Sequence, residues 1–499
     1  MYIDPLLAST YLGGGSDDRA YALAIDSSDN VYVAGSTYSS NFPTTQGAYD
    51  RSFNGGEDIF ISKLDSNFTR LLASTYLGGT GNDTLAFNAL TIDSSGNVYV
   101  AGWTESNDFP TTSEAYDKSY DGNRDGFISK LDSNLTKLLA STYLGGSRYD
   151  YVKAITIDSS GNLYVAGNTD SRDFPTISGS GAYQITNKGA SDVFISKLDS
   201  NLKELLASTY LGGDSTDIAE DLVIDPLGNV YVTGYTYSSN FPTTSGAYQI
   251  TNKGASDVFI SKLDSNLKEL LASTYLGGTG NDDLAFALAI DGSGNVYVAG
   301  WTNSKDFPTP SLWAYEHIFQ GFYDGFVSKL NSNFSKLLAS TYIGGAYFDA
   351  VYTIMIDKSD NIYLAGVTTP TKFPGDDYNL SSDAFILKLD SDLTKPLAST
   401  YFGGSSGDLA RALVIDKLGN VYVAGWTNSK DFPTTQGSFN RSLNGGDDAF
   451  VSKFDANLLY DTIGSSGSVN IGSGTGGSGG GGCSMVAGAS PANLLIWLL

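Results

Sequence analysis

Aspartates that recur at equivalent positions are the residues of this sequence with the clearest chemical potential. Seven times along the chain, an Asp follows the second glycine of a Gly-Gly pair by four residues. These residues are Asp18, Asp83, Asp150, Asp217, Asp282, Asp349 and Asp408. Carboxylates placed around one opening would suit a calcium ion. An Asp before a strand also commonly accepts backbone N–H groups and shapes its own turn. Because the Asp recurs in every unit, we favour the turn and keep calcium as the alternative.

A second recurring position changes from unit to unit, just after the glycine of a Val-Tyr-Val-Ala-Gly segment. Its occupants are Ser36, Trp103, Asn168, Tyr235, Trp301, Val367 and Trp426. Aromatic rings offer platforms for sugar rings or apolar groups of a partner. Trp103, Tyr235, Trp301 and Trp426 are therefore candidate ligand-binding residues. The alternative, which has the greater weight, is packing against the Phe-Pro loop of the same unit.

The sequence holds no obvious catalytic constellation. His317 is the only histidine, which excludes a Ser-His-Asp triad and a centre of several histidines. Cys483 is the only cysteine, so no internal disulfide forms. A pair of carboxylates acting on a polysaccharide, as hydrolase or lyase, remains open. Because the aspartates occupy repeated positions, we expect a protein that is not an enzyme and has no cofactor beyond possible calcium.

The charge of the chain restricts its partners. The formal net charge is −25, so nucleic acid is not expected as a partner, because it is bound by clustered Lys and Arg. Glycans, neutral polymers and cations remain compatible with this charge. Aromatic residues reach 12% and glycine 58 residues, which indicates short strands joined by many turns and not a disordered chain.

One unit recurs seven times and must position these residues. The segment Ser-Thr-Tyr-Leu-Gly-Gly, with small variations, begins at Ser9, Ser74, Ser141, Ser208, Ser273, Ser340 and Ser399. The first unit predicts four strands, rich in Val, Ile, Tyr and Phe and bounded by Gly, Asn, Asp and Ser. We name them a (Ala20–Asp26), b (Val31–Ser36), c (Asp58–Leu64) and d (Leu71–Leu77).

Strand counting predicts a closed ring. The chain has seven a-b-c sets but eight d-like stretches, because Leu6–Leu12 and Leu458–Ile463 both qualify. A closed ring removes exposed sheet edges, and blade numbers of about 4–8 are usual. We predict an all-β, seven-bladed β-propeller of four-stranded antiparallel blades over residues 1–463. Leu6–Leu12 is expected to close the ring by pairing with the strand at 448–454.

Strand order also predicts where the connections lie. In an up-and-down blade, the d–a and b–c connections share one face, and the a–b and c–d turns share the other. The b–c loops are long and carry Phe-Pro, so we expect binding on their face. Strand c carries a Lys among apolar residues, such as Lys63, which needs an acidic partner. Asp26 and its equivalents in the a–b turns are expected to shape turns and not calcium loops.

The repeat resembles a known bacterial family. The pattern STYLGG…AIDSSGNVYVAG…FPTT…GAY…DVFISKLD is similar to the β-propeller repeats abbreviated SBBP, and it covers roughly residues 6–463. The resemblance implies a propeller fold and an envelope or surface setting. It implies no particular reaction.

The two ends of the chain predict export. Residues 464–482 are rich in Gly and Ser and indicate a flexible linker. Residues 483–499 contain Cys483 and end in the apolar segment 493–499, which is too short to span a bilayer. This tail resembles truncated C-terminal sorting tails of Gram-negative surface proteins, with processing or anchoring near Cys483. Met1–Pro5 has no signal-peptide features, so we expect that the true N-terminus is missing.

These features together predict a scaffold at the cell surface or outside a Gram-negative-type cell. It is expected to contact an extracellular polysaccharide or an envelope protein through the long-loop face, with membrane association only through the tail. The alternatives are a carboxylate-based propeller enzyme and a passive spacer.

Overall fold

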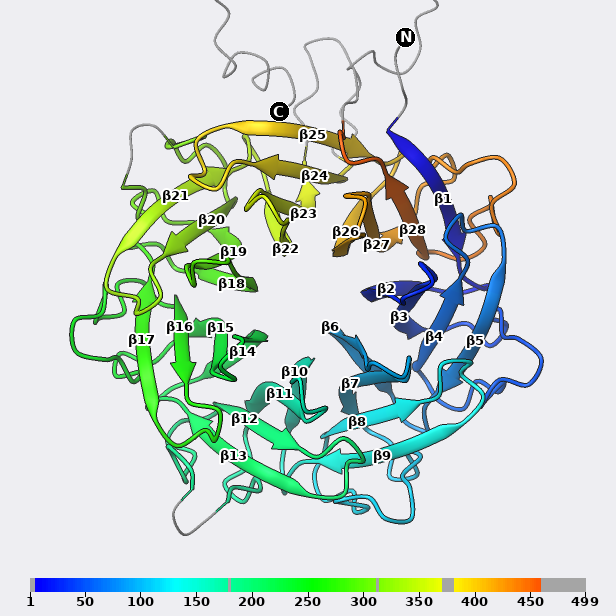
Figure 1. The fold of residues 1–499 in the computed structure, drawn as a ribbon, viewed down its shortest axis with the longest axis horizontal. Helices are drawn as coiled ribbons and strands as arrows, with labels where there is room; N and C mark the ends of the chain where they lie inside the picture. The colour runs from blue at the N-terminus through cyan, green and yellow to red at the C-terminus, as the bar shows by residue number, and fades with distance from the viewer. Residues whose placement is uncertain (1–4, 178–180, 311–313, 370–380, 459–499) are drawn as a thin grey trace, which may run out of the picture.

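The computed structural model describes residues 5–177, 181–310, 314–369 and 381–458. All regular structure in these residues is β-strand. Seven four-stranded sheets stand side by side around one axis, and each is a blade of a closed ring (Figure 1). The predicted all-β, seven-bladed propeller is confirmed.

We number the blades 1 to 7 along the chain, from the sheet that contains β2 to the sheet that contains β26. Each blade contains its strands in the order a, b, c, d from the axis outward (Figure 1). The a strands are β2 (Asp18–Ile25), β6 (Asp83–Ile92), β10 (Asp150–Ile157), β14 (Asp217–Ile224), β18 (Asp283–Ile290), β22 (Ala350–Ile356) and β26 (Asp408–Ile415). The b strands are β3 (Val31–Thr37), β7 (Val98–Thr104), β11 (Leu163–Thr169), β15 (Val230–Thr236), β19 (Val296–Thr302), β23 (Ile362–Thr368) and β27 (Val421–Thr427). The c strands are β4 (Asp58–Leu64), β8 (Asp125–Leu131), β12 (Asp192–Leu198), β16 (Asp257–Leu263), β20 (Asp324–Leu330), β24 (Asp383–Leu389) and β28 (Asp448–Phe454). The d strands are β5 (Leu71–Leu77), β9 (Leu138–Leu144), β13 (Leu205–Leu211), β17 (Leu270–Leu276), β21 (Leu337–Ile343), β25 (Pro396–Phe402) and β1 (Leu6–Leu12).

The N-terminal strand closes the ring. The seventh sheet has the order β1-β28-β27-β26, and β1 pairs antiparallel with β28, for example Thr10 with Val451. The two ends of the propeller therefore share one blade, as the strand count predicted. Of the second terminal candidate, Leu458–Ile463, all but Leu458 lies outside the described residues.

The hydrophobic core lies between neighbouring blades. Val193 and Ile195 of blade 3 form one buried cluster with Val230 and Phe259 of blade 4, and similar clusters occur around the ring. The strands are apolar on both faces because each blade packs against a neighbour on either side. This double packing explains why the sequence alternates so weakly.

A Lys, an Asp and a Tyr join neighbouring blades at the face of the a–b and c–d turns, which we call the turn face. Lys63 Nζ lies 3.0 Å from Asp26 Oδ2 and 4.7 Å from the centre of the Tyr32 ring. The Tyr32 hydroxyl donates a hydrogen bond of 2.8 Å to the Ser133 carbonyl oxygen, in the next blade. The predicted acidic partner of the strand-c lysine is thus the Asp of the a–b turn.

The same Asp shapes its turn, as the sequence predicted. Asp26 Oδ1 accepts the backbone N–H groups of Ser28 and Asn30, each at 2.9 Å. These bonds and the nearby ammonium lower the pKa of Asp26 below its ordinary value, although burial opposes them.

A β-bulge interrupts every innermost strand. In β2, Ala20 and Ala22 pair with consecutive residues of β3, which leaves Tyr21 unpaired. Opposite the bulge, a Cβ on Gly35 would lie 1.9 Å from the Arg19 carbonyl oxygen, so only glycine fits. The same contact, at 1.8–2.0 Å, occurs at Gly102, Gly167, Gly234, Gly300, Gly366 and Gly425. Bulges re-aim side chains. Six of the innermost strands leave one residue unpaired, whereas β6 leaves the four residues 86–89 unpaired.

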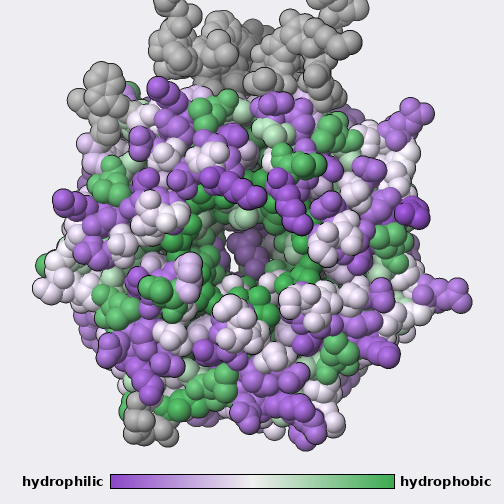
Figure 2. Space-filling model, in the orientation of Figure 1, coloured by the Kyte–Doolittle hydropathy of each residue, from purple (hydrophilic) through white to green (hydrophobic). Residues whose placement is uncertain are grey.

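The ring is hollowed at its centre. The space-filling view down the axis shows hydrophobic residues around the opening and a hydrophilic group inside it (Figure 2). We call this opening the channel. We call the face that carries the d–a and b–c connections the mouth face, and it lies opposite the turn face.

Candidate functional site

The variable aromatic residues lie at the ends of the b strands, on the mouth face. Trp103, for example, pairs with Thr84 of the innermost strand and with Gly126 of strand c. The four predicted residues, Trp103, Tyr235, Trp301 and Trp426, are all half-buried. Their smaller counterparts, Ser36, Asn168 and Val367, are buried. The aromatic rings therefore keep part of their surface in contact with solvent near the channel.

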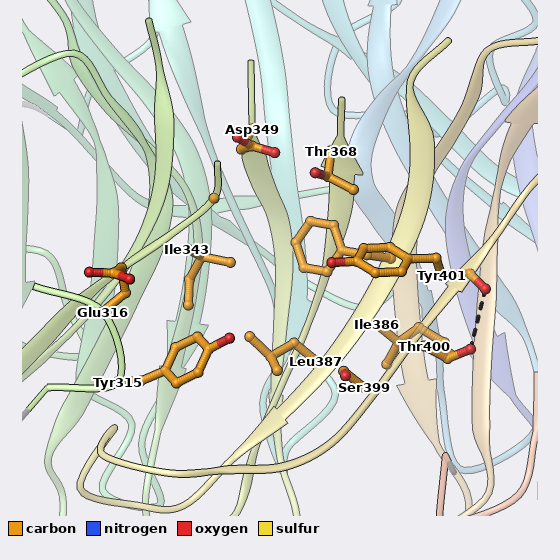
Figure 3. Close-up of a pocket in the computed structure, with 12 residues that line it drawn as sticks. Tyr315, Glu316, Ile343, Asp349, Thr368, Ile386, Leu387, Ser399, Thr400 and Tyr401 are labelled. Carbon is orange, nitrogen blue, oxygen red and sulfur yellow. Dashed lines mark hydrogen bonds between the residues drawn. The ribbon is translucent and has the colours of Figure 1, made fainter. Parts of the chain in front are cut away.

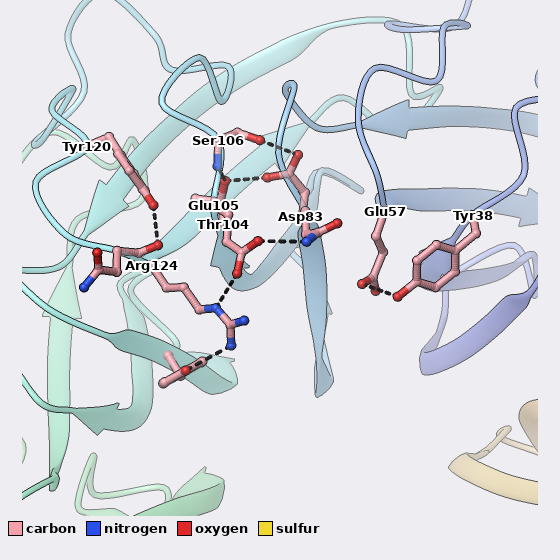
Figure 4. Close-up of polar contacts among 11 residues, drawn as sticks. Tyr38, Glu57, Asp83, Thr104, Glu105, Ser106, Tyr120 and Arg124 are labelled. Carbon is pink, nitrogen blue, oxygen red and sulfur yellow. Dashed lines mark hydrogen bonds and ion pairs between the residues drawn. The ribbon is translucent and has the colours of Figure 1, made fainter.

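Trp103 is held by residues of two blades, and Figure 4 shows two of them, Arg124 and Glu105. The Arg124 guanidinium lies 4.4 Å above the indole ring, and its Nε donates to Glu105 at 2.6 Å. Arg124 also donates to the Tyr151 hydroxyl at 3.1 Å, and the Tyr151 ring meets Trp103 edge-on at 5.9 Å. The platform is thus fixed in orientation, with a paired cation on one side.

Trp301 belongs to an aromatic cluster in which the guanidinium of Arg411 lies 5.8 Å from the Phe286 ring and not over the indole. The rings of Tyr323 and Phe348 lie 4.7 Å and 6.3 Å from it, and Phe286 lies 6.4 Å away. Phe322, next to this cluster in the chain, is 74% exposed. This side of the mouth face is the more apolar one.

Trp426 and Tyr235 complete the set. Arg19 lies 5.7 Å above Trp426 and pairs with Asp447 at 2.6 Å, an arrangement like that of Trp103. Tyr235 packs against Tyr237 at 6.1 Å. Burial, followed by the negative charge of Glu220, raises the pKa of the Tyr235 hydroxyl above its ordinary value.

The alternative prediction was packing against the Phe-Pro loop of the same blade, and this loop does contribute contacts. Arg124 is the last residue of the b–c loop that follows Trp103, and Tyr323 is the last residue of the loop that follows Trp301. The Phe-Pro phenylalanine Phe109 stacks on Phe127 at 4.5 Å and contacts Tyr143 at 6.2 Å. Trp103 contacts the end of this same loop, at Arg124, and Tyr151 of the next blade.

The predicted aspartates are turn builders within their own blades (Figure 4). Asp83 accepts hydrogen bonds from Thr104 Oγ1, from Ser106 Oγ at 2.9 Å and from the Gly79 N–H at 2.6 Å. It is fully buried, and burial raises its pKa to about 6. Asp83 thus ties the d–a turn to the start of the b–c loop, and Asp18, Asp150, Asp217 and Asp408 do the same. In the described residues no three acidic, His or Cys side chains come together as a metal site, and calcium binding stays a prediction.

One of the seven aspartates was placed at the wrong residue. In the fifth unit the strand begins at Asp283, which accepts from the Gly278 N–H and Ser304 Oγ as Asp83 does in blade 2. Asp282 is half-exposed and precedes the strand. The connection in this unit has one extra residue, which fixed spacing from the glycine pair does not detect.

A second ring of aspartates, at the start of the c strands, was not predicted as a site. Asp58 is fully buried, and its Oδ2 accepts the Asn54 N–H at 2.8 Å, while its Oδ1 has no hydrogen-bond partner. Burial first, then the charge of Asp83, raises its pKa to about 7. A Cβ on Gly78 would lie 2.6 Å from Asp58 Oδ1 and 2.8 Å from Asp83 Oδ2. The first glycine of the Gly-Gly pair therefore admits two carboxyl groups at one blade junction.

The long b–c loops cover the outer wall of the ring. The Thr45 N–H donates to the Ser74 carbonyl oxygen of strand d at 3.1 Å, which shields that edge strand. The Tyr49 N–H then donates to the Leu135 carbonyl oxygen, in the c–d turn of the next blade, at 2.8 Å. The loops begin on the mouth face, as predicted, but most of their length fastens one blade to the next.

The sixth blade contains a pocket (Figure 3). The cavity has a volume of about 40 Å³ and lies between Tyr315 of the preceding loop and Phe385 and Tyr401 of blade 6. Asp349 and Thr368 also line it, and each has a buried oxygen without a hydrogen-bond partner. In the other blades the Phe-Pro phenylalanine stacks at the position equivalent to Phe385, as in Phe42 on Phe60. Its counterpart, Phe373, lies outside the described residues.

The geometry defines the class of the protein as a seven-bladed β-propeller with an aromatic-rimmed channel. The SBBP β-propeller repeat matches residues 9–43, 74–110, 141–175, 208–242, 273–308 and 399–433. Six of the seven units therefore match the SBBP β-propeller repeat, as the sequence pattern suggested. The unit that begins at Ser340, which has the shortened loop, falls outside the matched ranges.

Solved structures show a distant similarity to this chain, at low sequence identity and with TM-scores below 0.5. BamB from Moraxella catarrhalis is 10% identical, over 90% of this chain and 99% of its own, with a TM-score of 0.36. The polysaccharide lyase Uly1 is 9% identical, over 89% and 90%, with a TM-score of 0.42. A quinohemoprotein alcohol dehydrogenase from Comamonas testosteroni is 10% identical, over 94% and 78%, with a TM-score of 0.42. Such similarities carry no argument about binding or activity. No curated protein matches the chain.

The predicted linker and tail, with Cys483, lie outside the described residues. Among the residues that are described, no helix has the length and hydropathy of a membrane span.

Proposed function

We propose that this protein is a surface-displayed binding scaffold, and that its mouth face contacts an extracellular polysaccharide or an envelope protein. The contact surface is the rim of the channel, formed by the ends of the b strands and the adjoining connections. The proposed contact surface is smaller than the predicted long-loop face, because the long loops themselves cover the outer wall of the ring.

One observation carries the proposal: half-exposed aromatic rings occupy the position at which the blades differ, and this position surrounds the channel. Further aromatic side chains on the same face are exposed, among them Tyr38, Tyr149 and Tyr237. Rings of this kind stack on sugars and anchor protein contacts at low entropic cost. The guanidinium groups beside Trp103 and Trp426 are already paired with carboxylates. They hold the rings in place without adding free positive charge at the rim.

A binding role fits the buried carboxylates better than catalysis does. Asp58 and Asp83, and their equivalents at the other junctions, are close to one another but shielded from solvent. A carboxylate pair that cleaves a glycosidic bond must reach both substrate and water. His317 lies exposed in a loop of blade 5. We therefore propose a protein without enzymatic activity, displayed at the surface through the tail that the sequence predicts.

A binding screen against glycans and envelope fractions tests the proposal, with a turnover assay on every ligand that binds. The test variant combines Trp103→Ala, Trp301→Ala and Trp426→Ala. The control combines Leu227→Ala and Leu418→Ala, which also remove exposed apolar surface but from the turn face, where these side chains are 84% and 83% exposed.

Binding lost in the tryptophan variant and kept in the leucine variant supports the scaffold. Binding lost only in the leucine variant places the contact on the turn face and contradicts the proposal. Turnover that depends on a single Asp identifies an enzyme instead. If the protein binds nothing in the screen, the result favours the passive spacer.

A further inference from the structure

Seven side chains, one from each blade, meet in the middle of the channel. They come from the β-bulges of the innermost strands, and Phe87 is one of the four residues that the longer bulge of β6 leaves unpaired. The seven residues are Tyr21, Phe87, Lys153, Glu220, Phe286, Tyr352 and Arg411. At many other positions of the blades the same residue type recurs, as with the aspartates and glycines described above. This ring of seven holds five residue types, so it breaks the repeat symmetry as the variable position at the ends of the b strands does.

Arg411 crosses the channel. It comes from blade 7, and its guanidinium carbon lies 3.6 Å from the centre of the Phe87 ring in blade 2. The same carbon lies 3.9 Å from the Tyr352 ring in blade 6 and 5.8 Å from the Phe286 ring in blade 5. Aromatic residues therefore surround the guanidinium, and Tyr352 also interacts with it by a side-chain hydrogen bond.

The positive charge of Arg411 has no ion-pair partner among the described residues. Its Nε is buried without a hydrogen-bond acceptor, and the residue is only 8% exposed. Burial lowers the pKa of the guanidinium below its ordinary value. The channel carboxylate that acts on it, Glu220, already pairs with Lys153 at 3.8 Å. A buried and unpaired charge is costly, so the site needs an anion that the described residues do not supply.

The middle of the channel is net positive in a strongly negative protein. Arg411 and Lys153 contribute two positive charges, and Glu220 contributes one negative charge, whereas the whole chain carries −25. At the channel mouth, Arg19 is paired with Asp447 and adds no free charge. The aromatic walls suit a ligand that combines an anionic head with a flat or apolar body.

We propose that the channel binds an organic carboxylate, whose oxygens accept hydrogen bonds from the Arg411 guanidinium between Phe87 and Tyr352. The carboxylate can belong to a free small molecule or to an acidic sugar of a polymer that enters through the mouth. This site is separate from the proposed function, since it stands even if the mouth aromatics bind nothing.

Calorimetric titration of the full chain with benzoate, glucuronate and an oligomeric polyuronate tests the site. Benzamide is the uncharged control. We expect the carboxylates to bind and benzamide not to bind. Arg411→Met should weaken carboxylate binding by about tenfold or more, because a charge-assisted hydrogen bond is lost. Glu220→Gln should tighten it, because the competing carboxylate is removed and Lys153 is released. Arg124→Met, at the mouth, should leave benzoate binding unchanged.

The two substitutions in the channel act in opposite directions, so the test remains decisive if Arg411→Met does not fold. Carboxylate binding that Glu220→Gln leaves unchanged or weakens contradicts the site, as does equal binding of benzoate and benzamide. Binding of the polyuronate but of neither small acid identifies a polymer as the source. Binding of the small acids that survives the triple tryptophan variant of the mouth separates this site from the proposed function.

Discussion

The substitution Asp58→Asn should raise the free energy of unfolding, relative to the native protein, more at pH 8 than at pH 5. The carboxyl group is fully buried, its Oδ1 has no hydrogen-bond partner, and the Asp83 carboxyl group lies nearby. An asparagine would keep the oxygen that accepts the Asn54 N–H. It would also bring an N–H₂ group to face Asp83, which is a donor where the native residue has a second acceptor.

The magnitude follows from the raised pKa. Burial raises the pKa of Asp58 from 3.8 to about 7, so between these values the folded state holds a proton that the unfolded state has lost. Stability therefore decreases as pH rises through this window, by about 1.4 kcal/mol per pH unit, and levels off above pH 7. From pH 5 to pH 8 this group costs the native protein about 3 kcal/mol as an upper limit, because Asp83 titrates with it.

Urea unfolding at pH 5, 6, 7 and 8, followed by circular dichroism, measures the effect. The free-energy difference between Asp58→Asn and the native protein should shift in favour of the variant across this series. Asp26→Asn is the control, because the pKa of Asp26 is lowered and the contribution of its charge is lost only as pH falls below about 4. The unfolding free energy of Asp26→Asn, plotted against pH, should run parallel to that of the native protein. If Asp58→Asn is instead most destabilising at pH 8, the ionised carboxylates hold a cation and the burial argument fails.

Three further predictions concern the frame of the ring. Gly300→Ala should destabilise by about 3 kcal/mol or more in urea unfolding, because its Cβ would lie 1.8 Å from the Leu284 carbonyl oxygen. Gly292→Ala, with no atom within 4 Å of its Cβ, should stay within about 0.5 kcal/mol; equal effects would contradict the bulge argument. Deletion of residues 1–14 should lower the melting temperature, because β28 loses its edge partner, whereas deletion of 464–499 should not change it. EDTA and added Ca²⁺ should each change the melting temperature little, and a large rise with Ca²⁺ would make the turn aspartates ligands.

The sequence was sufficient for the fold because the physical signals repeat seven times. Strands c and d of the first unit were predicted at their observed ends, Asp58–Leu64 and Leu71–Leu77, since turn residues bound them on both sides. The pairing of Leu6–Leu12 with the strand at 448–454 followed from a surplus strand that an open edge would leave unpaired. The Asp282 error shows the limit of fixed spacing, because one inserted residue moves the strand start to Asp283.

The candidate site was predicted only in part. The variable aromatics could be found because they follow an invariant glycine. Their contacts come both from the b–c loop of the same blade, as with Tyr323 beside Trp301, and from neighbouring blades, as with Tyr151 beside Trp103. The channel ring could not be found, because a bulge has no residue type of its own. Lys153 and Arg411 look like solvent-facing residues of an alternating strand until the pairing register places them at the axis.

The blades differ in sequence mainly near the axis, and this favours the axis as the functional part of the ring. Residues 181–213 and 246–278 are identical, and they form the loop and the two outer strands of blades 3 and 4. The inner strands of these two blades, β10 and β14, differ at most positions and carry Lys153 and Glu220 at the bulge. Outer strands face the same packing problem in every blade, so one solution serves all of them. Inner strands meet at one axis, where seven identical side chains would repel one another or leave a gap. Different residues there relieve this crowding, but crowding alone does not require an unpaired guanidinium in the middle. That charge is explained once an anion is placed beside it.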